Sequence, residues 1–562
     1  MGKGGKLDIT KTTKKIGGSM TKAKITSLYE SMMEESKANP MYSTVLENEC
    51  LIVHRFANGR VSEKLTERDV ESMASGERKV FFIDAGMGAG KTTWIFEGPL
   101  PKLKNKGKKI AYLVPRVSLA ISIKEQLSKN DMDAMEVKRT LNEYGLQKQV
   151  DFKVMDILTY QSAFQLSCKD ASEYGLIVFD EAHYFIEDAV FNRETKKQLE
   201  FLLNKFALVN KVFISATMED VFDVLYQKCR EISVKSCYKS VWYEHYYFER
   251  NFDYIRPKFF WEIKDLLEQI QGDDQKWLIF VDNLEKGYEL EAIFNEKVKD
   301  SAIFFDAKAK EDERSLSVMR MITDETLETK IGILTSAFDV GINIKDKSVA
   351  IVIYSYTKTQ FLQELGRKRI NGQERVQLYV NIPEKKKLSN RMVRIQQDIN
   401  RIIEKKDYYE NNPMFNGYYL EHPFYAVDGE VTYNHYAIEK LKLDYKSYES
   451  ILNTKEDSYE QGFIKTVLSW LEWSDEDIEI YLSENDTTDE LRLQILNLIN
   501  KVGRKMSLNQ FEDFTMQLLK IHDLRADKRA SRIGSIQAVN KVLKLVSYKA
   551  HKSNEFYFIE KL

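Results

Sequence analysis

The chain of 562 residues lacks several features that would assign it to a common protein class. It has only four cysteines, and none of them forms a C-x-x-C pair, so neither a disulfide framework nor a thiolate zinc site is expected. Its seven histidines show no metal-binding spacing. No uninterrupted apolar run reaches the roughly 18 residues of a membrane span, and the first residues lack an apolar signal core. These absences predict a cytoplasmic protein with reduced thiols.

An excess of one charge is also missing, because 84 Lys and Arg residues stand against 86 Asp and Glu residues. The chain therefore has no global basic signature of a nucleic-acid binder, although a narrow groove needs only local charge. Basic residues do cluster over residues 385–401. The last 41 residues, from His522, hold nine Lys or Arg against four Asp or Glu. A hydrophobic fraction of 43% is ample for globular cores.

Short apolar runs alternate with helical patterns in two successive stretches of the chain. The runs of the first stretch lie at residues 80–83, 110–114, 152–155, 176–179 and 212–214, and those of the second at 277–281, 302–305, 331–334, 349–354 and 376–380. This alternation predicts an α/β fold with two parallel sheets covered by helices. Beyond residue 383, helical periodicity dominates.

Four regions are expected from these changes of pattern. They are a partly disordered N-terminal extension (1–45), a first α/β domain (46–232), a second α/β domain (233–384) and a mainly α-helical C-terminal region (385–562). In the last region we expect a basic helix over residues 391–405. A helix over 535–548 and a strand over 555–559 would end the chain, and with their basic excess could form a small winged-helix-like module.

The first apolar run of the first domain leads into a glycine-rich turn. The stretch Ala85-Gly86-Met87-Gly88-Ala89-Gly90-Lys91-Thr92 fits a phosphate-binding loop, with Ala85 in place of the leading glycine. Glycines let backbone N–H groups approach a polyphosphate, Lys91 can reach the β- and γ-phosphates, and the Thr92 hydroxyl can bind Mg²⁺. We therefore expect ATP to be bound by Gly86, Gly88, Ala89, Gly90, Lys91, Thr92 and Thr93.

Acidic residues follow a later apolar run of the same domain. Asp180-Glu181-Ala182-His183 comes directly after residues 176–179. Asp180 can hold Mg²⁺ through water, and Glu181 can orient and deprotonate the attacking water. An ordinary polar strand end is the alternative, but the phosphate-binding loop upstream argues against it. The two motifs together predict ATP hydrolysis with Mg²⁺.

Over roughly residues 78–383, these motifs resemble helicase superfamily two, in its DEAH-box-like branch. In that family two RecA-like domains enclose ATP, and nucleic acid lies across both. The resemblance implies that His183, Ser215 and Thr217 couple hydrolysis to domain movement. It also implies contacts to the nucleic-acid backbone, which would position a strand without reading its sequence, from Pro115, Arg116, Thr159 and Thr335.

The resemblance further implies that the second domain completes the ATP site. The turn from Gly341 to Asn343 would face the ATP cleft, and Gln363 would lie near the attacking water. Arg367 would be an arginine finger that stabilises charge in the transition state. The second arginine of this motif usually falls at position 370, whereas this chain has Arg369, which on a regular helix would lie off the shared face. Our hypothesis is that Arg367 is essential and Arg369 assists.

The resemblance implies an ATP-dependent nucleic-acid helicase or translocase, with ATP and Mg²⁺ as cofactors. No adenine-reading glutamine motif of the DEAD-box branch precedes the loop, which favours a DEAH-like translocase over a local RNA strand-separating enzyme. DNA, single-stranded or duplex, is favoured as the partner, and RNA is the alternative polymer. The alternative is a nucleic-acid-stimulated ATPase that remodels a protein partner, bound through the C-terminal region, without unwinding. An inactive ATPase serving as a binding module is disfavoured by the intact Lys91, Asp180, Glu181 and Arg367.

Overall fold

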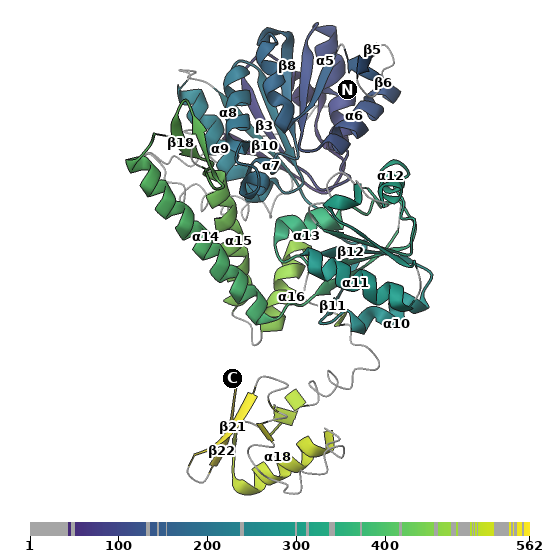
Figure 1. Cartoon of the computed structure of the whole chain (residues 1–562), viewed down its shortest axis with the longest axis vertical. Coiled ribbons are helices and arrows are strands. Elements are labelled where there is room, and N and C mark those ends of the chain that lie inside the picture. The colour runs from purple at the N-terminus through teal and green to yellow at the C-terminus, as the bar shows by residue number, and fades with distance from the viewer. Residues whose placement is uncertain are drawn as a thin grey trace, which may run out of the picture. The chain divides into compact units, whose positions relative to one another are not determined.

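Figure 1 shows the computed structural model of the chain. It describes residues 43–46, 51–130, 135–142, 145–152, 154–235, 241–297, 300–310, 314–335, 343–370, 374–414, 419–454, 459–473, 479–480, 495–496, 498–499, 501–502, 504–521, 539–540, 543, 548–553 and 556–561. The chain divides into two compact units. The first comprises Met1–Pro257 and Asp274–Ile478, and the second comprises Lys258–Asp273 and Glu479–Leu562.

The first unit begins with an eight-stranded sheet in the order β1-β2-β10-β3-β9-β8-β4-β7. Its strands are β1 (Ser43–Leu46), β2 (Leu51–Phe56), β3 (Lys79–Asp84), β4 (Lys109–Val114), β7 (Met155–Thr159), β8 (Tyr174–Asp180), β9 (Asn210–Ser215) and β10 (Trp242–Phe248). All neighbouring pairs are parallel except β1 with β2. A parallel sheet brings the carboxyl ends of its strands to one edge, and the predicted motifs follow those ends.

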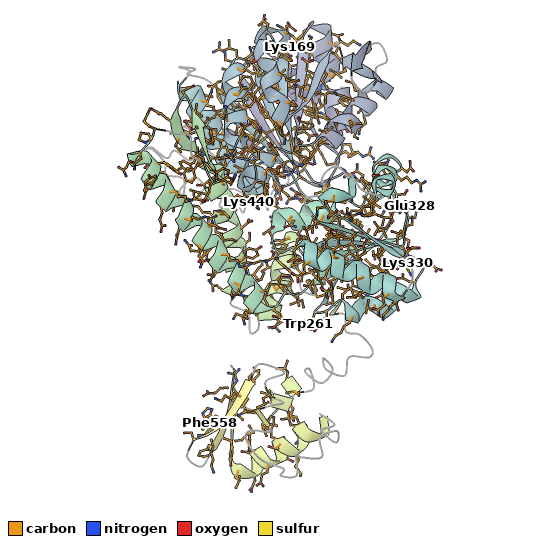
Figure 2. All side chains as sticks on the ribbon, in the orientation of Figure 1. Lys169, Trp261, Glu328, Lys330, Lys440 and Phe558 are labelled. Atoms are coloured by element: carbon orange, nitrogen blue, oxygen red, sulfur yellow. The ribbon has the colours of Figure 1, made fainter. Side chains whose placement is uncertain are left out.

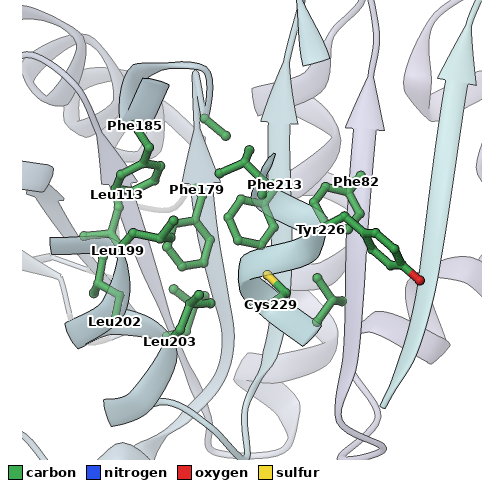
Figure 3. Close-up of a cluster of buried hydrophobic side chains, with 14 of the residues drawn as sticks. Phe82, Leu113, Phe179, Phe185, Leu199, Leu202, Leu203, Phe213, Tyr226 and Cys229 are labelled. Carbon is green, nitrogen blue, oxygen red and sulfur yellow. The ribbon is translucent and has the colours of Figure 1, made fainter. Parts of the chain in front are cut away.

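Helices cover both faces of this sheet, with α5 and α6 on one side and α8 and α9 on the other (Figure 1). One face packs against α2 (Val61–Lys64), α3 (Glu67–Met73), α4 (Lys91–Glu97), α5 (Pro99–Asn105) and α6 (Val117–Asn130). The other packs against η2 (Tyr160–Cys168), α7 (Tyr184–Glu187), α8 (Thr195–Lys205) and α9 (Met218–Lys235). Burial on both faces explains why the strands are continuous apolar runs. Figure 3 shows the second of these cores, in which Phe82, Phe179 and Phe213 pack under α8 and α9.

Two details of this domain differ from the sequence-based expectation. Strand β10 lies beyond residue 232, where we expected the domain to end, yet it pairs between β2 and β3. The expected strand over residues 152–155 is divided between two elements, because β6 (Gly145–Phe152) forms an antiparallel hairpin with β5 (Met135–Asn142) and β7 begins at Met155. Neither pairing could be read from a local apolar pattern.

A second parallel sheet follows in the same unit. It contains β13 (Ala302–Phe305), β14 (Ile331–Thr335), β12 (Lys276–Val281), β15 (Val349–Ile353) and β16 (Val376–Asn381), paired in that order. Its helices include α11 (Leu284–Lys297), α12 (Ser315–Thr323) and α13 (Lys358–Leu365). The expected fold class is thus confirmed: two tandem RecA-like α/β domains with parallel sheets.

A mainly helical region follows the second sheet, as expected. It consists of α14 (Lys385–Asn411), the hairpin β17 (Phe424–Val427) with β18 (Glu430–Tyr433), α15 (Tyr436–Leu452) and α16 (Tyr459–Trp470). Helix α14 contains the predicted basic helix, and its Arg391 pairs with Asp282 of the second domain. Helix α15 packs on the first domain, where Lys440 lies 2.6 Å from Glu187 of α7. This region therefore contacts both α/β domains.

The second unit has its own hydrophobic core. Strand β11 (Ile255–Phe260) leads into it, followed by α10 (Lys264–Gly272), and β19 (Glu479–Ile480) pairs with β11. An antiparallel sheet has the order β20-β22-β21, from β20 (Lys505–Met506), β22 (Phe556–Lys561) and β21 (Tyr548–Ser553). Helix α18 (Leu508–Ile521) packs on one face of this sheet.

The C-terminal expectations are partly met within this unit. The expected strand over 555–559 corresponds to β22. Most of the expected helix over 535–548 lies outside the described residues, as does the N-terminal extension up to residue 42. Tyr548 begins a strand. Within the described part of the chain, no helix is long and apolar enough to cross a membrane.

Candidate active site

The phosphate-binding loop connects β3 to α4. Gly88 and Gly90 have φ values of +74° and +75°, a backbone conformation that disfavours residues with a side chain. The Nζ atom of Lys91 donates hydrogen bonds to the carbonyl oxygens of Ala85, at 2.7 Å, and Gly86, at 3.0 Å. The ammonium group thus lies inside the curve of the loop, where a phosphate would meet it. Thr92 and Thr93 follow in the first turn of α4.

Asp180 lies at the carboxyl end of β8 and is almost fully buried. One of its oxygens accepts a hydrogen bond from the Tyr112 hydroxyl at 2.8 Å, and the other accepts from the Glu181 backbone N–H at 3.0 Å. Burial, reinforced by the neighbouring Glu181 charge, raises the pKa of Asp180 to about 7. The Tyr112 hydroxyl is also hydrogen-bonded to Thr92. Tyr112 therefore joins the two residues expected to hold Mg²⁺.

A hydroxyl and a carboxylate fit Mg²⁺, which takes oxygen ligands and keeps several waters beside substrate phosphates. The described residues contain no group of three or more His, Cys, Asp or Glu side chains that could hold a metal ion. The Thr92 hydroxyl and the Asp180 carboxylate are oxygen donors of the kind that Mg²⁺ takes beside the phosphates of a nucleotide.

Glu181 has an unusual backbone for a non-glycine residue, with φ at +50°. Such strain is often found at functional sites, where the surrounding structure holds it. Burial acts to raise the pKa of Glu181, but electrostatic interactions with the neighbouring His183, Lys91, Arg367 and Arg369 outweigh it and lower the pKa. The carboxylate is therefore ionised at neutral pH and can accept a hydrogen bond from water.

His183 connects the acidic motif with two other motifs. Its Nδ1 lies 2.9 Å from the Ser215 hydroxyl, which also accepts a hydrogen bond from the Thr217 backbone N–H at 3.0 Å. Its Nε2 lies 2.8 Å from Nε2 of Gln363 in the second domain. Burial lowers the pKa of His183, so the ring is neutral and one of its nitrogens can accept. The structure therefore brings together the three predicted coupling residues and Gln363.

The arginine-bearing segment departs from the helical geometry that we assumed. Helix α13 ends at Leu365, so Arg367 and Arg369 lie beyond it, and a comparison of helical faces does not apply to them. The backbone around Ile344 holds the segment instead, through hydrogen bonds with Arg367 and Arg369. Both arginines lie close enough to Glu181 to lower its pKa.

Asn343 is the predicted cleft residue of the preceding motif, and it supports Arg369. Its side-chain oxygen accepts a hydrogen bond from Nε of Arg369 at 2.7 Å. The guanidinium of Arg369 then lies beside the loop, with Nη1 3.9 Å from where a Cβ on Gly88 would stand. Gly341, the other predicted residue of this motif, lies outside the described residues.

A cleft of about 500 Å³ opens beside the phosphate-binding loop. Its lining comes from both domains and includes Gly86–Ala89 of the loop and Arg369 of the second domain. Sequence reasoning missed the rest of the wall, which includes Asn58, Arg60, Phe252 and Tyr254. No motif marks these residues. They reach the cleft because the backbone N–H of Val61 bonds to the carbonyl of Ala89, at 2.9 Å, and because β10 delivers the following segment to the same sheet edge.

Sequence reasoning also missed a buried carboxylate at the end of β3. Asp84 accepts a hydrogen bond from Arg250 at 3.1 Å and another from the Glu219 backbone N–H at 3.1 Å. Burial raises the pKa of Asp84 to about 6, even though Arg250 opposes that shift. Glu219 in turn pairs with Lys358 of the second domain at 2.8 Å. These residues form a second polar link between the two α/β domains.

The residues expected to contact nucleic acid lie at or just beyond the carboxyl ends of three strands. Pro115 and Thr335 are buried, following β4 and ending β14. Thr159 ends β7 and accepts a hydrogen bond from the Ser162 backbone N–H. Arg116 forms an ion pair with Asp188, with 2.7 Å between Nη2 and Oδ2. A phosphate would have to displace Asp188 to bind this guanidinium.

Comparisons with known proteins locate one family within the chain. Residues 66–224 match the family model of the DEAD/DEAH box helicase. No curated protein sequence matches. Among solved structures, S. cerevisiae Dbp5 bound to RNA and ADP BeF3 is similar at a TM-score of 0.42 and 16% identity, over 58% of this chain and 84% of that one. Its L327V variant has a TM-score of 0.42 and 14% identity, over 59% and 84%.

Mycobacterium smegmatis helicase Lhr bound to ssDNA and AMP-PNP is similar at a TM-score of 0.41 and 15% identity, over 59% of this chain and 47% of that one. The matched family segment contains both the phosphate-binding loop and the Asp-Glu-Ala-His motif at the carboxyl edge of one parallel sheet. Residues 66–224 of the chain therefore match a DEAD/DEAH box helicase domain.

Proposed function

We propose that this helicase-family enzyme is a motor in which ATP hydrolysis between the two α/β domains drives movement along a nucleic-acid strand. The hydrogen bond between His183 and Gln363 supports this most directly, because it joins residues 180 positions apart that belong to different domains. Through His183, a change at the hydrolytic Glu181 would reach the second domain in a single step.

In this proposal, the first domain binds the triphosphate. Lys91 exchanges its bonds to the Ala85 and Gly86 carbonyls for the β- and γ-phosphates. Thr92 and Asp180 hold Mg²⁺, which when bound neutralises charge on the phosphates. Glu181 is ionised, so it can orient the attacking water and take a proton from it.

The second domain contributes the remaining catalytic groups. Gln363 lies near the attacking water, and Arg367 stabilises the charge that develops on the phosphates. Arg369, held by Asn343, positions the phosphates from the side of Gly88. This division of roles retains our hypothesis that Arg367 is essential and Arg369 assists.

The strand would be held at the carboxyl edges of the two sheets. Pro115, Arg116, Thr159 and Thr335 would contact its backbone, with Arg116 leaving Asp188 for a phosphate. DNA is our proposed track. The cleft wall upstream of the loop presents Asn58 and Arg60, and the sequence has no glutamine motif of the DEAD-box branch there, which favours a DEAH-like translocase. We further propose that the protein acts in the cytoplasm.

The test is ATP hydrolysis by the full-length protein alone and with single-stranded DNA, duplex DNA or RNA, with Lys91→Ala as the inactive control. We expect single-stranded DNA to stimulate hydrolysis most. If none of these polymers changes the rate of ATP hydrolysis, the proposed motor function is refuted. A duplex-unwinding assay then distinguishes the helicase from an ATPase that remodels a protein partner, since only the helicase separates strands.

A further inference from the structure

The sheet of the second unit carries aromatic side chains on the face that α18 does not cover. Alternation along β22 directs Tyr557 and Ile559 into the core with α18, so Phe556 and Phe558 point to the opposite face. Phe558 can be seen in Figure 2 on the side of β22 away from α18. Phe556 keeps 40% of its surface exposed. Alternate residues of a strand lie about 7 Å apart, so the two rings form a short row.

Positive side chains flank this aromatic row. The Nζ atom of Lys505, on β20, lies 4.2 Å from the ring centroid of Phe556 and 6.0 Å from that of Phe558. His551, on β21, stacks on Phe558 with centroids 5.5 Å apart and rings inclined by 17°. Lys549 shares the face of His551, because alternate residues of β21 point the same way. Among the described residues of these strands, one carboxylate, Glu560, lies on this face, 3.6 Å from His551.

The charge of the surrounding chain has the same sign. The last 41 residues hold nine Lys or Arg against four Asp or Glu, whereas the whole chain has a net charge of −2. The stretch of sequence that includes β21 and β22 thus carries an excess of basic residues, and such an excess would attract a polyanion. Flat rings beside lysines match a ligand that offers planar faces and negative charge together. Single-stranded nucleic acid does so, because its bases are free to stack, whereas a duplex keeps its base faces stacked on one another.

We propose that this sheet face binds single-stranded nucleic acid, with bases stacked on Phe556 and Phe558 and phosphates paired with Lys505 and Lys549. The inference deepens the proposed function and rests on it. It adds a point of attachment outside the two α/β domains, which would retain the strand while the ATP cleft opens and closes. Stacking is tolerant of base identity, so this face would bind without sequence preference.

The test measures binding of fluorescent single strands, one DNA and one RNA of about 20 nucleotides, to the full-length protein by anisotropy without ATP. The double variant Phe556→Leu with Phe558→Leu keeps apolar side chains but removes the flat rings. We expect its affinity to fall at least about tenfold, within the range for one or two lost stacking contacts. Lys505→Gln should make the negative slope of log affinity against log salt concentration less steep by about 0.7, because one phosphate contact is lost. DNA and RNA should respond alike.

Met516→Ala is the matched control, because Met516 is 50% exposed on α18 in the same unit, away from the proposed face. It should bind like the wild type, and all variants should keep the basal ATPase rate. If the double variant and Lys505→Gln, both folded by circular dichroism, bind as tightly as Met516→Ala, the site is refuted and the rings only stabilise the sheet. Failure of the wild type to bind any strand would instead overturn the proposed function.

Discussion

Replacing Tyr112 by phenylalanine removes one oxygen atom from the centre of the site assigned to Mg²⁺. The Tyr112 hydroxyl donates to Asp180 at 2.8 Å and is hydrogen-bonded to Thr92. Tyr112 is fully buried, so phenylalanine fills the same space without a change in packing. The variant therefore tests whether this hydroxyl orients the two metal-binding groups.

The magnitude follows from the charge on the acceptor. A hydrogen bond to a charged group contributes about 1.5–3 kcal/mol, which corresponds to roughly tenfold to a hundredfold in an equilibrium constant. We expect the dissociation constant of ADP measured with Mg²⁺ to rise by a factor in this range. The constant measured in EDTA should not change, because Tyr112 would act on the nucleotide only through the metal.

Tyr160→Phe is the matched control for this experiment. Tyr160 is equally buried, and its hydroxyl donates to the backbone carbonyl of the same Asp180 at 2.8 Å. The Tyr160→Phe substitution also removes one buried hydroxyl oxygen next to Asp180. It leaves the hydrogen bond between Tyr112 and the Asp180 carboxylate in place. Titrations of fluorescent ADP with and without Mg²⁺ give the metal-dependent part of binding for each protein. If the ratio of the ADP dissociation constants in EDTA and with Mg²⁺ is the same for both variants and the wild type, the role of Tyr112 is refuted.

Two further predictions concern the arginine segment and a buried histidine. Arg367→Ala should lower kcat for ATP by about a thousandfold or more, whereas Arg369→Ala should mainly raise KM; full turnover by Arg367→Ala would show that the finger lies elsewhere. Burial lowers the pKa of His245 to about 3, below the roughly 6.5 of an unfolded chain, so the unfolded state gains a proton first as the pH falls. Because of His245, the free energy of unfolding should fall by about 1.4 kcal/mol per pH unit from pH 6.5 down to about 3. The variant His245→Leu should lack this pH-dependent contribution when urea unfolding is measured at several pH values. Equal slopes of unfolding free energy against pH for the two proteins would contradict the lowered pKa of His245.

Much of the fold could be predicted because its signals are local. Each of the ten apolar runs that we took for strands lies in or overlaps a strand of the structure. The run over residues 152–155 was wrongly taken for one strand, because its first residue ends a local hairpin while its last residue begins a strand that pairs with β4. Strand β10 was assigned to the wrong domain, because its place depends on pairing with the distant β2 and β3. A strand that is central in a sheet and one that starts a new domain have the same local pattern.

In the candidate site, too, groups formed by residues close in sequence could be predicted, whereas contacts between residues far apart in the sequence could not. The loop around Lys91 and the Asp180–Glu181 pair could be predicted, since phosphate and metal chemistry requires contiguous residues there. Tyr112, Asp84 and Arg250 could not be predicted, because their roles come from neighbours that the sheet order and the segment after β10 supply. The helical argument for Arg367 and Arg369 failed because α13 ends before them.

The sequence alone determined that this chain has two parallel-sheet α/β domains, one of which carries a phosphate-binding loop and an acidic motif. These features follow from apolar periodicity and from residues a few positions apart. Only the tertiary structure decided that His183 meets Gln363, that Tyr112 joins Thr92 to Asp180, and that aromatic and basic side chains share one face of the last sheet. Such contacts depend on which strands pair and in what order, and this is set by packing between segments far apart in the chain.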